Sequence, residues 1–130
     1  MDRTILVVDD DDAVRRILRK LLESQSYRVV DSGRPEIACQ LFDADPAAID
    51  LVVTDMKMPM MSGQQLAAHV WRARADMPVV FISGYADQSY ARELEGARSR
   101  FIEKPFSSEL LLERIGELLA IPASGDAAPA

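Results

Sequence analysis

The sequence of 130 residues is poor in several features, and each shortage excludes a class of protein. It contains one cysteine, Cys39, so no disulfide can form within the chain, and we expect a reducing, cytoplasmic location. No apolar run approaches the roughly 20 residues of a membrane-spanning helix, and the residues from Met1 to Arg3 do not resemble the start of a signal peptide. We therefore expect no membrane partner.

Positive charge is also in short supply. The chain has 21 acidic and 15 basic residues, a net charge of -6, and its basic residues form no continuous stripe. Direct contact with nucleic acid is therefore not expected. Glycine is scarce after the first strand-like run, which excludes the Gly-rich turn of a flavin or nucleotide binder. Apolar residues at 48% and charged residues at 28% are typical of one globular domain.

Strand-like apolar runs alternate with helical patterns along the whole chain. We expect strands at residues 4–9, 27–31, 49–54, 78–83 and 100–103. Helices are predicted at 11–26, from Pro35, after a capping box of Ser62 and Gln65, from Asp87 to about Ala97, and after Ser107. Strict alternation predicts an α/β fold: a doubly wound, five-stranded parallel sheet in the order 2-1-3-4-5 with helices on both faces. Residues 1–120 would form this domain, and 121–130 a flexible tail or linker stub.

Polar residues stand where four of these apolar runs end. Asp9 and Asp10 follow the first run, Asp55 the third, Ser83 the fourth, and Lys104 the fifth. Because the carboxyl ends of parallel strands share one edge of the sheet, these side chains should converge. Three close carboxylates repel one another and favour a hard cation with oxygen ligands, for which Mg²⁺ is the best candidate. An ammonium and a hydroxyl suit phosphoryl oxygens, so the set fits the making and holding of an acyl phosphate at Asp55.

Each of these residues has a simpler interpretation when it is taken alone. The run from Asp9 to Asp12 could only cap a helix, and Asp55 could be a turn residue before a loop that contains Pro59. Ser83 and Lys104 likewise precede turn-forming residues. Four strand ends that carry the required residue types in the required order favour one shared site.

Four segments resemble the receiver domains of two-component response regulators: ILVVDDDDAVRRIL, DLVVTDMKMPMMSG, VVFISGYAD and FIEKPF. The resemblance covers residues 4 to about 119. It implies a phosphoacceptor signalling domain rather than an enzyme, in which Asp55 takes a phosphoryl group from a sensor histidine kinase or a histidine phosphotransfer protein. By resemblance, Asp10, Asp55 and the backbone carbonyl of Lys57 bind Mg²⁺ directly, and Asp9 acts through water. Ser83 and Lys104 would hold the phosphoryl oxygens, and Lys104-Pro105 would be a cis peptide.

The same resemblance implies a switch. Movement of Ser83 toward the phosphoryl group would vacate space for Phe101, and the altered surface would bind an unknown downstream protein or a second copy of the chain. Lys57 and Tyr85 match the two positions that tune the lifetime of the phosphate in this family. We expect both side chains to obstruct water and the phosphorylated form to be long-lived.

Two other functions compete with this interpretation. The spacing of Asp10 and Asp12 imitates the first motif of haloacid-dehalogenase-like phosphatases, but a helix should begin there, and no acidic pair follows Lys104 at a strand end. A receiver-like scaffold that is never phosphorylated is the second alternative. Such scaffolds typically lose the acidic pair, the acceptor or the lysine, all of which this chain keeps. We expect His69 to be a surface residue and Cys39 an inert buried thiol.

Overall fold

The computed structural model describes residues 3–84 and 96–121. The strands are β1 (Thr4–Val8), β2 (Arg28–Ser32), β3 (Leu51–Asp55), β4 (Val79–Ser83) and β5 (Ser99–Glu103). The helices are α1 (Asp12–Ser24), α2 (Pro35–Ala44), the short 3₁₀ helix η1 (Pro46–Ala48), α3 (Gly63–Ala73) and α5 (Ser108–Ala120). Tyr85, most of the helix expected from Asp87, and the tail beyond Ile121 lie outside the described residues.

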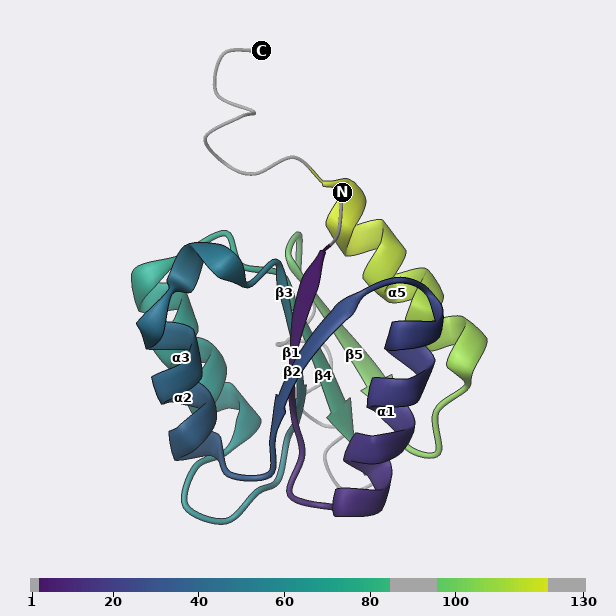
Figure 1. Ribbon diagram of the computed structural model, residues 1–130, viewed down its shortest axis with the longest axis horizontal. Helices are drawn as coiled ribbons and strands as arrows, with labels where there is room; N and C mark the ends of the chain where they lie inside the picture. Colours follow the sequence, from purple (N-terminus) through teal and green to yellow (C-terminus); the bar gives the residue numbers. More distant parts are fainter. Residues whose placement is uncertain (1–2, 85–95, 122–130) are drawn as a thin grey trace.

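All neighbouring strands pair in parallel, in the order β2-β1-β3-β4-β5. This confirms the predicted doubly wound sheet. The strands run downward in Figure 1, so that their carboxyl ends meet along the lower edge of the sheet. The order places β1 beside β3, with Val8 opposite Thr54. The residues that follow these two strands are therefore neighbours in space.

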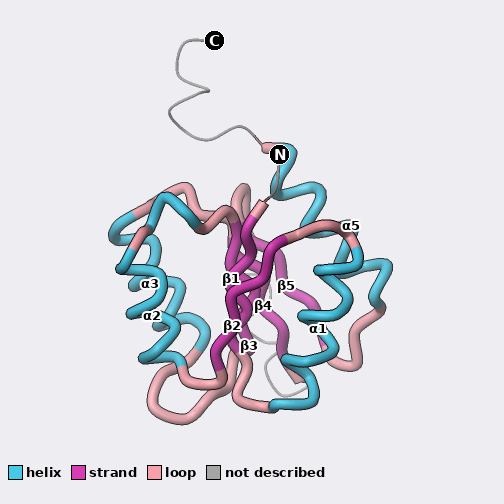
Figure 2. The backbone as a smooth tube through the Cα atoms, in the orientation of Figure 1, coloured by secondary structure: helices cyan, strands magenta, loops and turns pink. Residues whose placement is uncertain are grey.

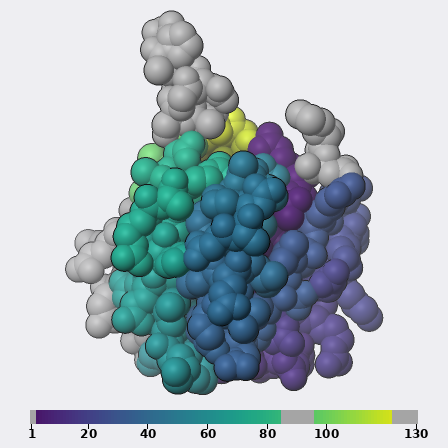
Figure 3. Space-filling view, turned by 60° about the vertical axis from the view of Figure 1, so that its left-hand side comes forward, coloured from purple at the N-terminus to yellow at the C-terminus, as the bar shows by residue number. Residues whose placement is uncertain are grey.

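Helices cover both faces of the sheet, α2 and α3 on one and α1 and α5 on the other (Figures 1 and 2). Side chains alternate between the two resulting cores: Leu6 and Val52 pack on the α2/α3 side, and Ile5 and Val53 on the α1/α5 side. Every residue of β3 and β4 is buried, as is typical of central parallel strands. Figure 3 shows α2 and α3 side by side over their face. Within the described ranges, no helix has the length and apolarity that crossing a bilayer requires.

Side-chain caps fix where helices begin at the lower edge. The Asp11 carboxylate accepts hydrogen bonds from the backbone of Ala13 and Val14, so that α1 begins at Asp12. The predicted capping box of Ser62 and Gln65 is present and begins α3. The Ser107 hydroxyl caps α5.

The element bounds differ from the expected ones by one or two residues. The third strand begins at Leu51 rather than Ile49, because the chain first forms η1 and the Asp50 carboxylate then accepts the Thr4 amide at 2.7 Å. Gly96, expected near the end of a fourth helix, instead forms an isolated bridge with Ser99.

Candidate functional site

Three aspartates meet at the lower edge of the sheet, where β1 and β3 end. One carboxylate oxygen from each of Asp9, Asp10 and Asp55 lies within 4.8 Å of the others. Asp9 is 1% exposed and Asp55 7%, whereas Asp10 is exposed to solvent. The strand order thus brings together the carboxylates that the sequence places about 45 residues apart.

Burial makes the charged form of two of these carboxyls less favourable than it is in water. It raises the pKa of Asp55, as does the nearby charge of Asp10, while Lys104 and the backbone amide of Lys57 oppose the rise. Burial also raises the pKa of Asp9, against a hydrogen bond from the Asp11 amide at 2.9 Å. The site therefore holds negative charge that the surrounding protein compensates only in part.

Lys104 provides positive charge at the site. Its Nζ lies 3.4 Å from Oδ2 of Asp55 and 3.8 Å from Oδ2 of Asp9. The peptide bond between Lys104 and Pro105 is cis, as expected, and the Lys104 amide donates to the Ser83 carbonyl at 2.7 Å. The side chain is 29% exposed, so its ammonium group is accessible from solvent.

The donor set fits a divalent cation such as Mg²⁺. Oδ2 of Asp9 is buried and accepts no hydrogen bond from the described part of the chain. A buried oxygen without a donor is costly unless a cation or water satisfies it. All three side chains offer hard oxygen ligands, which Mg²⁺ prefers. Asp9, Asp10 and Asp55 are thus the residues that could hold the metal.

Ser83 and Phe101 lie on one face of the sheet. Phe101 pairs with Phe81, and Ser83 lies two residues after Phe81 on β4. Because side chains alternate with a period of two, both Ser83 and Phe101 face the α2/α3 side, where Phe81 packs. Ser83 is fully buried, and its hydroxyl donates to the Gly84 carbonyl at 3.2 Å. Phe101 is half-buried against the α2/α3 core.

Lys57 is exposed two residues after Asp55, in the loop between β3 and α3. This loop passes so close to α3 that Gly63 has no room for a side chain: a Cβ there would lie 2.4 Å from the Asp55 carbonyl oxygen. Gly63 also donates its amide to the Met56 carbonyl at 2.9 Å. The glycine therefore fixes the backbone that follows the candidate acceptor.

Sequence reasoning missed two contributors to the site. Gly63 was not singled out, because only the close approach of the two backbones reveals its role. Arg15 was also missed, since an arginine near the start of an amphipathic helix usually points to solvent. Its Nη1 instead donates to the backbone carbonyl of Asp9 at 2.9 Å. No local sequence signal distinguishes Arg15 from the adjacent Arg16.

Of two peripheral residues, His69 differs in part from expectation and Cys39 agrees with it. His69 is not isolated on the surface of α3, because its Nε2 lies 2.8 Å from Oδ1 of Asp43 on α2. The pair joins the two helices that Figure 3 shows side by side. Cys39 is buried, as expected, and burial raises the pKa of its thiol.

Comparisons with known proteins define the class. The family model of the response regulator receiver domain matches residues 5–116. The chain is 30% identical over 118 residues to the response regulator receiver protein CpdR of Brucella abortus (strain 2308), covering 90% of this chain and 97% of that protein. The chain belongs to the receiver-domain family of two-component response regulators.

Longer proteins and a solved structure give the same result. The chain is 34% identical over 117 residues to the sensor kinase CckA of Brucella abortus (strain 2308), covering 89% of this chain but only 12% of the kinase. A crystal structure of a response regulator receiver protein from Sinorhizobium medicae WSM419 matches with a TM-score of 0.82 and 30% identity, covering 91% of this chain and 94% of that one. The fold and the two-component class are thus established.

The geometry also argues against the phosphatase alternative. Asp12 is the first residue of α1, and its carboxylate pairs with Arg15 at 2.6 Å. It therefore lies outside the cluster formed by Asp9, Asp10 and Asp55. The chain retains the acidic pair, the candidate acceptor and the lysine that a non-phosphorylated scaffold would typically lose.

Proposed function

We propose that the domain accepts a phosphoryl group on Asp55 from a phosphohistidine of a sensor histidine kinase or a histidine phosphotransfer protein. An oxygen of Asp55 would form the new bond to phosphorus while the bond from phosphorus to the donor imidazole nitrogen breaks, and that nitrogen keeps the electron pair. The observation that carries this proposal is the convergence of Asp9, Asp10, Asp55 and Lys104 at one edge of the sheet.

Asp9, Asp10, Asp55 and the backbone carbonyl of Lys57 would hold Mg²⁺, with Asp9 acting through water. The metal, when bound, would screen the repulsion between the incoming phosphoryl group and the carboxylates. The buried Oδ2 of Asp9, which lacks a hydrogen bond within the described ranges, supports this assignment.

Lys104 and Ser83 would then hold the phosphoryl oxygens. The Lys104 ammonium already lies 3.4 Å from Asp55, so it can pair with a phosphoryl oxygen without a large movement. The Ser83 hydroxyl would exchange its contact with the Gly84 carbonyl for one with the phosphoryl group. In this role the domain is a phosphoacceptor and not an enzyme with a separate substrate.

An apolar groove beside the site suits the donor protein. The groove, about 490 Å³, is lined by Val14, Ile17, Lys104, Pro105, Phe106 and Ser108. Ile17 is 57% exposed and shares this groove with Val14, Pro105 and Phe106, and a contiguous exposed apolar patch of this kind marks a candidate contact surface. Because Lys104 contributes to both the groove and the site, a donor helix seated on Ile17 could present its phosphohistidine to Asp55.

The output would follow from a switch of Ser83 and Phe101. Once Ser83 turns toward the phosphoryl group, Phe101 could move inward on the same face of the sheet, as its half-buried position permits. The altered surface would bind a downstream protein or a second copy of the chain.

We place this domain at residues 1–120, since α5 ends at Ala120, with 121–130 as a tail or linker stub. We expect the domain to act in the cytoplasm.

Lys57 and Tyr85 would prolong the phosphorylated state by obstructing the water that attacks phosphorus in line with Asp55. Exposed Lys57 follows the acceptor by two residues, and Tyr85 lies outside the described residues. Loss of phosphate from Asp55 should be faster in Lys57→Asn and Tyr85→Glu than in the parent, when followed by intact mass over time. Equal or slower loss in both variants would assign the lifetime to other groups.

Transfer from a histidine donor tests the function. A purified histidine kinase or phosphotransfer domain carrying phosphohistidine is mixed with the parent, with Asp55→Asn and with Ile17→Asp. We expect the parent alone to gain phosphate quickly, and Ile17→Asp to remain reactive toward a small phosphodonor. Transfer to Asp55→Asn at the parent rate would contradict the assignment of the acceptor.

A further inference from the structure

Arg15 makes contacts that the proposed chemistry does not itself require. Its three guanidinium nitrogens reach three separate partners: Nη1 donates to the Asp9 carbonyl at 2.9 Å, Nε to Asp31 at 2.9 Å, and Nη2 to Asp12 at 2.6 Å. One side chain thus joins the end of β1, strand β2 and the first residue of α1. Its planar set of donors suits three fixed partners.

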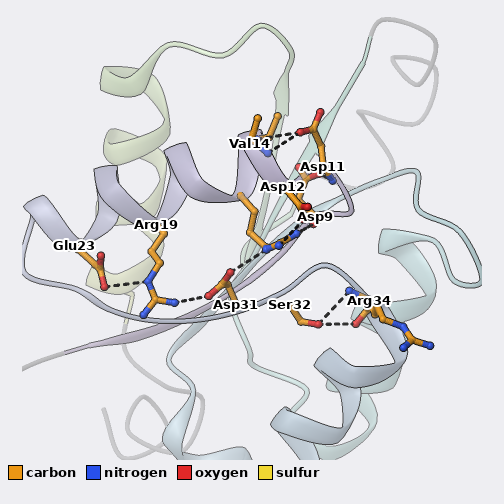
Figure 4. Close-up of polar contacts among 11 residues, drawn as sticks. Asp9, Asp11, Asp12, Val14, Arg19, Glu23, Asp31, Ser32 and Arg34 are labelled. Atoms are coloured by element: carbon orange, nitrogen blue, oxygen red, sulfur yellow. Dashed lines mark hydrogen bonds and ion pairs between the residues drawn. The ribbon is translucent and has the colours of Figure 1, made fainter.

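The surroundings hold the guanidinium in this place. The Arg15 side chain is 19% exposed, and Asp31 also pairs with Arg19, which in turn contacts Glu23 at 3.2 Å. Figure 4 shows Arg19 between Glu23 and Asp31, with Asp31 on the side of Asp9 and Asp12. Gly33 leaves the space that the guanidinium occupies, because a Cβ there would lie 2.6 Å from Nη1 of Arg15.

The contact with the Asp9 carbonyl is the informative one, because it acts on Asp10. The carbonyl of Asp9, the amide of Asp10 and the Asp10 Cα belong to the same planar peptide, so holding the carbonyl restrains the point from which the Asp10 side chain leaves the backbone. The Asp10 carboxylate itself has no hydrogen bond or ion pair with the described residues that would orient it. Its position therefore depends on the backbone that Arg15 holds.

We propose that Arg15 is a positioning residue of the metal site, which holds the turn after β1 so that Asp9 and Asp10 are preorganised to bind Mg²⁺. This inference rests on the proposed function in that the site is taken to bind Mg²⁺. The pair with Asp12, whose side chain is 75% exposed, contributes little to folding stability. The less exposed pair with Asp31 ties α1 to β2 but does not account for the hydrogen bond to the Asp9 carbonyl. Support of metal ligands from outside the coordination sphere typically changes metal affinity about 10–100-fold.

When Arg15 is replaced by an uncharged residue, the change in charge and the loss of the hydrogen bond predict opposite effects on Mg²⁺ binding. Loss of a cation near three carboxylates should tighten Mg²⁺ binding, because the site becomes more negative. Loss of the hydrogen bond from Arg15 to the Asp9 carbonyl should weaken Mg²⁺ binding. Arg16, the neighbouring and exposed arginine, has no hydrogen bond or ion pair among the described residues and supplies a matched control for charge.

The test is the dissociation constant of Mg²⁺, measured by calorimetry on the full chain. We expect it to rise about 10-fold in Arg15→Gln, at the lower end of the range for such support. Arg15→Lys, which keeps the charge but not the three-way contact, should recover only part of that loss. Arg16→Gln should bind Mg²⁺ as tightly as the parent or more tightly. Gly33→Ala, which displaces the guanidinium with every charge retained, should weaken binding in the same direction.

Parent-like or tighter binding in Arg15→Gln, or full recovery in Arg15→Lys, would overturn the proposal. If Arg15→Gln does not fold, as judged by circular dichroism, Gly33→Ala decides: an unchanged dissociation constant overturns the inference. Labelling of Asp55 by acetyl phosphate provides a second measurement, in which Arg15→Gln should need more Mg²⁺ yet approach the parent rate at saturation. A parent that binds Mg²⁺ but is never labelled contradicts the proposed function, while the dissociation constants still decide the role of Arg15.

Discussion

At the scale of single residues, Asp9 is the most unusual group in the molecule. Its carboxyl is 1% exposed, and one of its oxygens has no hydrogen bond from the described part of the chain. Lys104 offsets its charge only from 3.8 Å. Without metal, ionised Asp9 is therefore a cost to the folded state rather than a support.

This cost predicts how stability depends on pH. The pKa of Asp9 is raised by burial, so the folded state binds its proton more tightly than the unfolded state does. The contribution of Asp9 to stability is then greatest at low pH and is lost as pH rises through the raised pKa. Without metal, Asp9→Asn should be more stable than the parent at pH 7, and the difference should shrink as pH falls toward the ordinary carboxyl value of about 3.9.

Urea unfolding of the parent and of Asp9→Asn, from pH 7 down to about pH 4 and in the presence of chelator, measures the difference in their free energies of unfolding. If Asp9 helps to hold Mg²⁺ as proposed, saturating Mg²⁺ at pH 7 should reverse the sign of this difference in stability, because the variant loses one of the carboxylates. A difference that is independent of pH, or that grows toward acid, would show that Asp9 is not a buried charge of this kind.

At the scale of elements, the site depends on where helices begin. Asp11 and Ser62 cap α1 and α3 beside the strand ends, and both caps hold short loops against the sheet. Gly63 adds a close contact between α3 and the backbone of Asp55. Asp55 is thus held by α3, the helix that follows it, as well as by its own strand.

Two glycines in helices test this contact. Gly63→Ala would place a methyl group 2.4 Å from the Asp55 carbonyl oxygen, so we expect a loss of about 1–3 kcal/mol in the free energy of unfolding and slower labelling of Asp55. Gly116→Ala in α5 meets nothing within 4 Å and should instead stabilise by about 1 kcal/mol, through helix propensity. Denaturant unfolding measures the free energy of unfolding of both variants. Equal changes in Gly63→Ala and Gly116→Ala would mean that the contact at Gly63 does not constrain the loop.

The elements also show how far the sequence alone could be interpreted. Alternating periodicity predicted a parallel sheet, and the doubly wound topology predicted its strand order. The strand ends predicted that Asp9, Asp10, Asp55 and Lys104 would lie together, because the carboxyl ends of parallel strands share one edge. Arg15 and Gly63 could not be predicted, since their roles depend on distances between segments that have no signature in sequence. The start of β3 was misplaced for a related reason, as η1 and the contact from Asp50 to Thr4 are set by tertiary packing.

At the scale of the whole molecule, metal binding should be visible as folding stability. If Mg²⁺ binds only the folded state, it adds about 2.7 kcal/mol at 100 times its dissociation constant. Asp10→Ala should lose most of this gain, and without metal it should be at least as stable as the parent, because one repelling charge is gone. Thermal melts with and without Mg²⁺ make the comparison. Identical responses of parent and variant would exclude Asp10 from the metal site.

The central claim is that Asp55 is phosphorylated in a reaction that requires the acidic cluster to hold a cation. The most direct measurement is the intact mass of the protein after incubation with acetyl phosphate, with Mg²⁺ or with chelator, for the parent and for Asp55→Asn. We predict one added phosphoryl group in the parent with Mg²⁺, and none in the parent with chelator or in Asp55→Asn. Equal labelling of the two proteins, or labelling that chelator does not reduce, would contradict the account.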